Sequence, residues 1–164
     1  MLVAYVDIET TGLSSQNSEI TVIGIGLSPG KHLEVIQLVE EDVTRVKLLR
    51  ALKGVTALYT YNGGRFDLPF IHEHLGVDLA ERFEHRDLMF DCQNRGLFGG
   101  FKAVERQLGI RRKLPLGGAD AVRLWKEYKQ HGDNKALQTL LAYNREDIVN
   151  LRALRVKLGL KESE

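Results

Sequence analysis

The chain has 164 residues, of which 43% are hydrophobic and 27% are charged. This is the composition of a folded, water-soluble protein, and we expect residues 1–164 to form a single domain. The apolar runs are too short to cross a bilayer, and the N-terminal segment lacks the pattern of a secretion signal. One cysteine excludes an internal disulfide and a Cys-rich zinc site, so we expect a cytoplasmic protein with no membrane segment.

The net charge of +1 hides an uneven distribution along the chain. Residues 1–94 contain 8 Lys/Arg and 14 Asp/Glu, a net charge of −6, whereas residues 95–164 contain 15 Lys/Arg and 8 Asp/Glu, a net charge of +7. An acidic half joined to a basic half suits a site that holds cations and faces a polyanion. Solvated lysines on helix surfaces would explain the same split, so the charges alone leave both interpretations open.

The first half of the chain alternates strands with short helices. Leu2–Val6 is apolar on both faces, which predicts a central strand in a covered sheet. A turn at residues 28–31 separates the second and third strands, so the first three strands are expected to form an antiparallel meander. The other elements expected in this half are strands at residues 20–27, 32–39, 55–61 and 82–88 and helices at residues 41–53 and 67–75.

The second half of the chain is predicted to be helical, with Gly109, Pro115 and Gly132 marking the breaks. Residues 110–118 are expected to form a loop. The expected helices are residues 101–108, 119–131 and 134–158. Taken in this order, the elements predict an α/β fold with a mixed five-stranded sheet flanked by helices.

Two carboxylates, Asp7 and Glu9, come at the end of the first expected strand. Alternate residues of a strand point to the same side, so the two carboxylates are expected to lie on the same face of the strand. Neighbouring carboxylates repel one another unless a cation neutralises them, and hard cations such as Mg²⁺ or Mn²⁺ prefer oxygen ligands. A strand that simply leaves the core into a polar turn would explain this pair alone at least as well.

Asp147 lies in an apolar stripe of the last expected helix. An ionised carboxylate there is costly unless it is paired or bound to a metal, although a salt bridge to an arginine would also satisfy it. Tyr143 lies one turn earlier on the same face, where its hydroxyl can reach the same place or simply pack in the core. Asp67, which Leu68 and Pro69 follow, is by itself typical of a helix N-cap.

Three segments together resemble the motifs of the DEDD exonucleases, the DnaQ-like group built on the ribonuclease H fold. Residues 6–13 (Val-Asp-Ile-Glu-Thr-Thr-Gly-Leu), 62–67 (Asn-Gly-Gly-Arg-Phe-Asp) and 143–147 (Tyr-Asn-Arg-Glu-Asp) are similar to the first, second and third motifs, in the family's order. A histidine-type enzyme would carry histidine where this chain has Ala142, so the chain resembles the tyrosine subgroup (DEDDy). Residues 98–110 are also similar to the small YprB-like branch.

The resemblance implies a ribonuclease H-like fold and a 3′→5′ exonuclease that releases nucleoside 5′-monophosphates from the 3′ ends of nucleic acid. Two divalent cations, Mg²⁺ or Mn²⁺, would be held by Asp7, Glu9, Asp67 and Asp147 and would promote an in-line displacement. Tyr143 would orient the attacking water rather than act as a strong base, because an unperturbed tyrosine has a pKa of about 10. Single-stranded DNA is the favoured substrate, with RNA as an alternative.

Substrate contacts are expected beside the motifs and in the basic half of the chain. Thr10 and Leu13 would meet the terminal nucleotide, and Asn62 and Phe66 would line the same pocket. The candidates for a phosphate track, each of which would also serve as a solvated surface charge, are Lys102, Arg106, Arg111, Arg112 and Lys113. A homo-oligomer or a protein partner is a further expectation, because the chain is small and has few aromatic residues to hold a strand.

Two other functions stay open. A ribonuclease H-like or junction-type endonuclease would use the same fold, although a tyrosine four residues before Asp147 is typical of the exonucleases. A non-catalytic nucleic-acid-binding module is the second alternative. The presence of all four acids and of Tyr143 argues against such a module.

Overall fold

The computed structural model describes residues 1–161, in which five strands form one mixed sheet with the order β3-β2-β1-β4-β5. β1 is antiparallel to β2 and β2 to β3, whereas β4 is parallel to β1 and β5 is parallel to β4. The strands are β1 (Leu2–Thr10), β2 (Ile20–Pro29), β3 (Glu34–Val39), β4 (Ala57–Thr60) and β5 (Glu84–Asp87). The predicted mixed sheet, its antiparallel meander and the central place of the first strand are confirmed.

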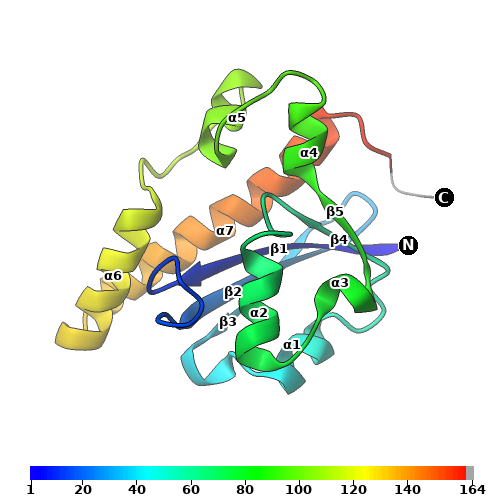
Figure 1. Ribbon diagram of the computed structural model, residues 1–164. Coiled ribbons are helices and arrows are strands. Elements are labelled where there is room, and N and C mark those ends of the chain that lie inside the picture. The colour runs from blue at the N-terminus through cyan, green and yellow to red at the C-terminus, as the bar shows by residue number, and fades with distance from the viewer. Residues whose placement is uncertain (162–164) are drawn as a thin grey trace.

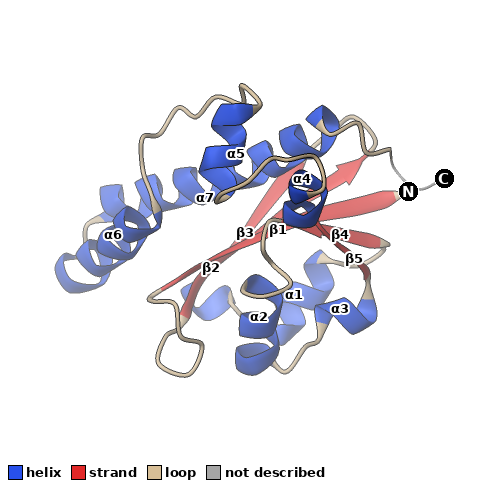
Figure 2. Cartoon of the chain, turned by 45° about the horizontal axis from the view of Figure 1, so that its top comes forward, coloured by secondary structure: helices blue, strands red, loops and turns tan. Residues whose placement is uncertain are grey.

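Helices cover both faces of the sheet (Figures 1 and 2). They are η1 (Glu40–Asp42), α1 (Arg45–Ala51), α2 (Asp67–Leu75), α3 (Leu79–Arg82), α4 (Leu88–Gln93), α5 (Phe101–Gln107), α6 (Gly118–His131) and α7 (Asn134–Lys157). α1, α2 and α3 pack on one face, and α4, α5, α6 and α7 lie over the other. Within residues 1–161, no helix combines the length and the apolar character that crossing a bilayer requires.

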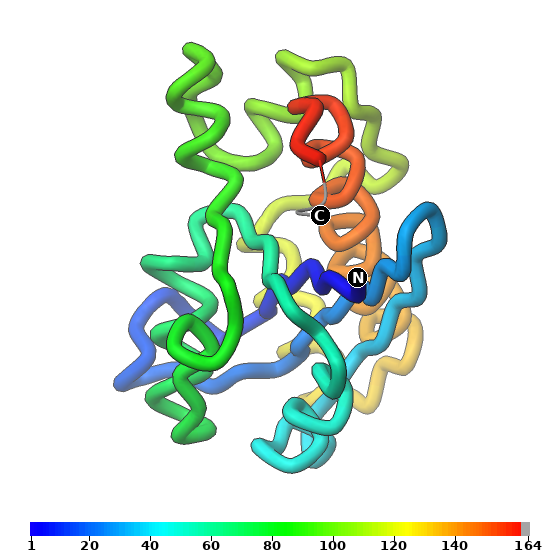
Figure 3. The backbone as a smooth tube through the Cα atoms, turned by 90° about the vertical axis from the view of Figure 1, so that its right-hand side faces the viewer, coloured from blue at the N-terminus to red at the C-terminus, as the bar shows by residue number. Residues whose placement is uncertain are grey.

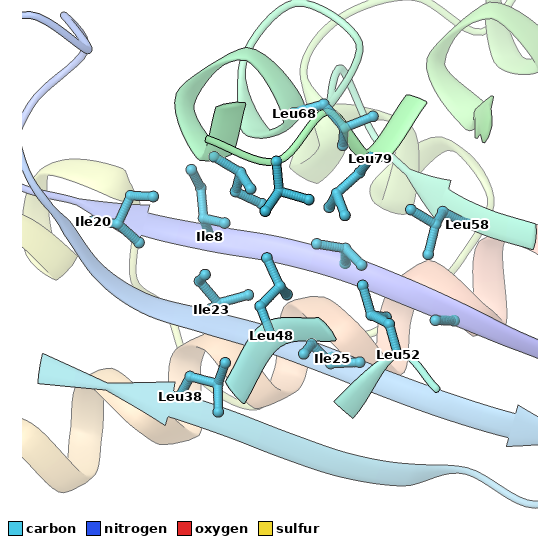
Figure 4. Close-up of a cluster of buried hydrophobic side chains, with 14 of the residues drawn as sticks. Ile8, Ile20, Ile23, Ile25, Leu38, Leu48, Leu52, Leu58, Leu68 and Leu79 are labelled. Atoms are coloured by element: carbon cyan, nitrogen blue, oxygen red, sulfur yellow. The ribbon is translucent and has the colours of Figure 1, made fainter. Parts of the chain in front are cut away.

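The alternation of β1 explains why the sheet has a core on each side. Ala4, Val6 and Ile8 enter the cluster beneath α1, α2 and α3, part of which Figure 4 shows. Val3 and Tyr5 enter the opposite cluster, against α4, α5 and α7. A strand buried on both faces reads as a continuous apolar run, and this is why it was recognisable in the sequence. Asp7 and Glu9 continue the face of Val3 and Tyr5.

The two ends of β1 lie at opposite ends of the molecule. The start of β1 and the end of α7 face the viewer in Figure 3 and lie on the same side in Figure 1. The carboxyl end of β1 therefore points away from them, toward α6 and the first half of α7 (Figure 1). This is where the acidic residues of the first motif are delivered.

Several predicted element boundaries are wrong. β1 continues to Thr10, beyond the predicted apolar run at residues 2–6, and Asp7 and Glu9 lie in its last four residues. The predicted helix at residues 41–53 is broken after η1, and α1 starts only after Thr44, whose hydroxyl accepts a hydrogen bond from the N–H of Lys47 at 3.2 Å. An N-cap of this kind begins a new helix and ends the continuity that the apolar spacing suggested.

The predicted strands at residues 55–61 and 82–88 are also shorter than expected, as β4 and β5 show. Asp87 ends β5 because its side chain accepts a hydrogen bond from the N–H of Met89 at 3.1 Å and caps α4. The sequence did not predict α3 or α4. Helices of four and six residues are too short to display a helical period.

Candidate active site

Three carboxylates meet near the carboxyl end of β1. Asp7 and Glu9 share one face of this strand, and Asp147 projects from α7, which packs against it. One carboxylate oxygen of each residue lies within 4.8 Å of the other two. Asp7 is half-buried, whereas Glu9 and Asp147 are only 8% and 5% exposed. Oxygen ligands at this spacing suit a hard divalent cation.

The electrostatics of the cluster fit a cation as well. Burial and the neighbouring carboxylates raise the pKa of Asp7 and of Glu9 well above the ordinary values. Burial also raises the pKa of Asp147, an effect that Arg112 and Lys102 oppose without cancelling. Buried acids that repel one another in this way are stabilised when a cation neutralises them. The donor set therefore fits a divalent metal.

Asp67 lies beside this group of three rather than within it. Its Oδ1 accepts a hydrogen bond from the backbone N–H of Ile8 at 2.9 Å, which ties the start of α2 to β1. Burial and the nearby acids Asp87 and Asp147 raise the pKa of Asp67 to about 7. Asp67 is not the N-cap of α2, because Phe66 holds that position and no side chain caps the helix there.

Arg112 forms the salt bridge that the sequence left open for Asp147. Its Nη2 donates to Oδ1 of Asp147, while Nε and Nη2 donate to the two carboxylate oxygens of Glu105 at 2.8 and 2.6 Å. Asn150 donates to the same Glu105 at 2.8 Å. One guanidinium is thus shared between two buried acids. It cannot neutralise Asp7 and Glu9 in addition.

Tyr143 stands on α7 one turn before Asp147 and is 3% exposed. Its hydroxyl accepts a hydrogen bond from Nζ of Lys102 at 2.7 Å. Burial and the neighbouring acids, Asp147 first among them, raise the pKa of Tyr143 above its ordinary value. The hydroxyl therefore keeps its proton at neutral pH, so it can donate a hydrogen bond but is unsuited to act as a base.

These residues open onto a cleft of about 460 Å³. Its charged and polar lining includes the three clustered acids, Tyr143 and Lys102. Its apolar lining consists of Ile8, Leu13, Tyr61, Phe66, Phe101 and Val122. Phe101 stacks on Tyr61 with ring centres 5.1 Å apart. A cleft lined by both charged and aromatic groups suits a ligand that has both a phosphate and a flat ring.

Residues 4–159 match the RNase_H superfamily. The chain belongs to this superfamily. The match covers β1 to α7, so the mixed sheet and its flanking helices are the ribonuclease H-like fold that the sequence predicted.

Solved structures with the same fold have low sequence identity to this superfamily member. The family B DNA polymerase from the hyperthermophilic archaeon Pyrobaculum calidifontis is 16% identical (TM-score 0.72), and the match covers 96% of this chain and 24% of the polymerase. A nuclease in its apo form is 20% identical (TM-score 0.61), and the match covers 95% of this chain and 70% of the nuclease. NrnC of Brucella melitensis with bound Mg²⁺ is 19% identical (TM-score 0.52), and the match covers 96% of this chain and 84% of NrnC. No curated protein matches the chain in sequence.

Of the residues of this RNase_H superfamily protein that were expected to contact substrate, some line the cleft and others do not. Thr10, Leu13, Phe66 and Lys102 line the cleft with the acids. Asn62 does not line it: its N–H donates to Oδ1 of Asp87 at 2.8 Å, and its φ of 59° forms the turn after β4. The turn expected from the sequence is therefore the better description of Asn62.

The basic residues predicted to form a phosphate track do not all lie in one groove. Arg106, Arg112 and Lys113 line a second groove of about 390 Å³, which shares Lys102 with the cleft. Arg112 is not a free phosphate ligand, because its side chain is only 12% exposed and is paired with Glu105 and Asp147. Arg111 is exposed and lines neither space.

Sequence reasoning missed the polar residues that support the acids. Asn144 is fully buried and donates to Asp7, and Gln37 donates to Asn144 across 107 residues of sequence. Glu105 is 1% exposed and anchors Arg112. Only Asn144 carried a signal, namely its place inside the third motif next to Tyr143. No local pattern connects the others to the site.

Proposed function

We propose that this protein is a metal-dependent 3′→5′ exonuclease of the tyrosine (DEDDy) type that hydrolyses phosphodiester bonds in nucleic acid. The observation that carries the proposal is the convergence of Asp7, Glu9 and Asp147 with Tyr143 in one cleft. A tyrosine four residues before Asp147 resembles the exonucleases, so it favours them over an endonuclease of the same superfamily. We propose that residues 1–164 form one exonuclease domain.

The proposed cofactors are two divalent cations, Mg²⁺ or Mn²⁺. Asp7, Glu9 and Asp147 would hold them, with Asp67 as the fourth acid of the set. Bound cations would supply positive charge where negative charge develops on the phosphate oxygens during the displacement. The fold of NrnC, solved with Mg²⁺, supports this choice of metal.

The protein's own groups would orient the reactants. Tyr143 keeps its proton, so its hydroxyl would hold the attacking water or a phosphate oxygen by donating a hydrogen bond. Lys102 adds a positive charge beside that hydroxyl. Leu13, which is 89% exposed, and Phe66 line the cleft and would contact the terminal base. The product would be a nucleoside 5′-monophosphate.

The rest of the strand would leave the cleft by the groove that shares Lys102 with it. Arg106 and Lys113 are exposed cations of this groove, whereas Arg112 forms salt bridges with Glu105 and Asp147. Exposed cations along a groove bind phosphates without reading sequence. We propose single-stranded DNA as the favoured substrate, with RNA as the alternative, and a homo-oligomer or protein partner as a further aid to binding.

The test uses matched oligonucleotides labelled at the 5′ end, incubated with Mg²⁺ or Mn²⁺. The proposal expects a ladder that shortens from the 3′ end, release of nucleoside 5′-monophosphates, and no cleavage in EDTA. A single internal cut would identify an endonuclease instead, and binding without cleavage would identify a binding module. Parallel reactions with single-stranded DNA, RNA and recessed duplex then decide the substrate.

A further inference from the structure

Three adjacent strands each place one residue beneath Asn144. Asp7 of β1 is paired with Gly24 of β2, and Gly24 is paired with Gln37 of β3. Directly opposite residues of antiparallel strands share a face of the sheet, so the three positions form a row that faces α7. Asn144 of α7 lies over this row and is fully buried.

The amide of Asn144 bridges the row from end to end. Its Nδ2 donates to Oδ2 of Asp7 at 3.2 Å and to the backbone carbonyl of Asp7 at 3.3 Å. Its Oδ1 accepts a hydrogen bond from Nε2 of Gln37 at 3.0 Å. A carboxylate of the acidic cluster is therefore connected, through one buried amide, to a strand that contributes no acid to that cluster.

Gly24 provides the space for this bridge. A Cβ atom on Gly24 would lie 2.3 Å from Oδ1 of Asn144 and 3.0 Å from its Nδ2. Any side chain at this position would push the amide away from Gln37, from Asp7 or from both. The glycine is needed here for close approach rather than for an unusual backbone conformation.

Gln37 decides which end of the Asn144 amide faces Asp7. The carboxylate and the carbonyl of Asp7 only accept hydrogen bonds, so Asn144 must present its NH₂ group to them. Gln37 ensures this orientation because its own NH₂ group donates to Oδ1 of Asn144. The orientation of Gln37 is held in turn by a second donated bond, to the carbonyl of Leu141 at 2.8 Å.

We propose that Gln37 and Asn144 are positioning residues that hold the Asp7 carboxylate in the orientation in which it binds metal. The Asp7 side chain is only half-buried, and the bond that Asn144 donates to its Oδ2 restricts its rotation. Partners of this kind orient metal ligands, and their loss lowers metal affinity or activity by about 10- to 100-fold. The inference rests on the proposed metal-dependent function.

The test compares Gln37→Leu and Gln37→Glu with the wild type in the full chain. Gln37 contacts none of the clustered acids directly, and leucine has a similar volume, so the fold is expected to persist. Gln37→Leu removes the donor and is expected to weaken Mn²⁺ binding by about tenfold. Gln37→Glu is expected to weaken it further, because a carboxylate attracts Nδ2 of Asn144 and turns Oδ1 toward Asp7. Gln138→Leu, on the exposed side of α7, is the matched control and should bind Mn²⁺ like the wild type.

Three measurements on each protein separate the outcomes: Mn²⁺ affinity by calorimetry, urea unfolding without metal, and the Mn²⁺ concentration that half-saturates cleavage. Weaker Mn²⁺ binding in both Gln37 variants, with an unchanged control, supports the inference. Lower stability with unchanged Mn²⁺ affinity would mean that Gln37 only joins β3 to α7, and would overturn it. If the wild type binds Mn²⁺ but cleaves nothing, the exonuclease proposal fails while the affinities still decide the positioning role. If the wild type binds no Mn²⁺, both fail.

Discussion

Lys102 donates a hydrogen bond to the Tyr143 hydroxyl at 2.7 Å, and the same ammonium lies 4.9 Å from the centre of the tyrosine ring. The hydroxyl accepts this bond with a lone pair, so its own proton stays available to a group in the cleft. Both residues belong to the basic half of the chain, whereas Asp7 and Glu9, which line the same cleft, belong to the acidic half. Lys102 lines both the acidic cleft and the basic groove.

Tyr143→Phe is expected to lower kcat by about 10²-fold, the typical cost of removing one oriented donor from an active site. Mn²⁺ affinity should not change, because the oxygens expected to bind the metal are those of Asp7, Glu9 and Asp147. The ring stays in the core, so urea unfolding should change little. Tyr128→Phe, which removes a hydroxyl that donates to Glu40, is the control and should cleave normally. If Tyr143→Phe folds and cleaves like the wild type, the hydroxyl has no part in the reaction and the core-packing interpretation of this tyrosine is correct.

Lys102→Met is expected to reduce kcat/KM and to make binding less sensitive to salt. Loss of one phosphate contact should lower the slope of log affinity against log salt concentration by about one. The measurement is binding of a labelled single-stranded oligonucleotide at several salt concentrations in the presence of Ca²⁺. Lys126→Met removes an exposed lysine of α6 that lines neither space, and an equal change in its slope would argue against a specific role of Lys102.

Asp7→Ala is expected to abolish metal-dependent cleavage, by more than about a thousandfold, since metal ions supply several kcal/mol to such reactions. The fold should persist. Without metal the variant should unfold at a urea concentration no lower than the wild type, because one of the repelling carboxylates is gone. Full activity in this variant would contradict the assignment of the site.

The raised pKa of Asp67 predicts how the free energy of unfolding of the metal-free protein depends on pH. Burial raises its pKa from 3.8 to about 7, so the folded state holds this proton more tightly than the unfolded state. The resulting stabilisation is complete below about pH 4 and is lost as the pH rises toward about 7. Asp67→Asn keeps an acceptor for the Ile8 N–H without the charge. We expect it to unfold like the wild type at pH 4 and to be more stable at pH 8, as measured by urea unfolding in EDTA.

Arg112→Ala is expected to lower the free energy of unfolding by about 3–5 kcal/mol, because it leaves Glu105 buried without its cation. Adding Glu105→Gln to this variant should restore part of the loss, since the amide carries no charge. Both values come from urea unfolding in EDTA. A loss of well under 1 kcal/mol would show that the guanidinium is weakly bound and free to meet a substrate, as the phosphate-track interpretation held.

The sequence by itself determined the sheet and the acidic character of the candidate site. A strand that is apolar on both faces and a tight turn at residues 28–31 are local signals, so the central place of β1 and the meander of β1, β2 and β3 could be predicted. The Asp7–Glu9 pair and the Tyr143–Asp147 spacing are local as well. Each follows from the period of a single strand or a single helix.

Only the tertiary structure decided which side chains support these acids and which compete for them. The bonds from Gln37 through Asn144 to Asp7, and the sharing of Arg112 between Glu105 and Asp147, join elements that are distant in sequence. No local period encodes such contacts, because they depend on which faces of the elements meet when the helices pack on the two faces of the sheet. For the same reason the sequence suggested an exposed cation at Arg112, whereas in the fold its side chain is only 12% exposed and is paired with two buried acids.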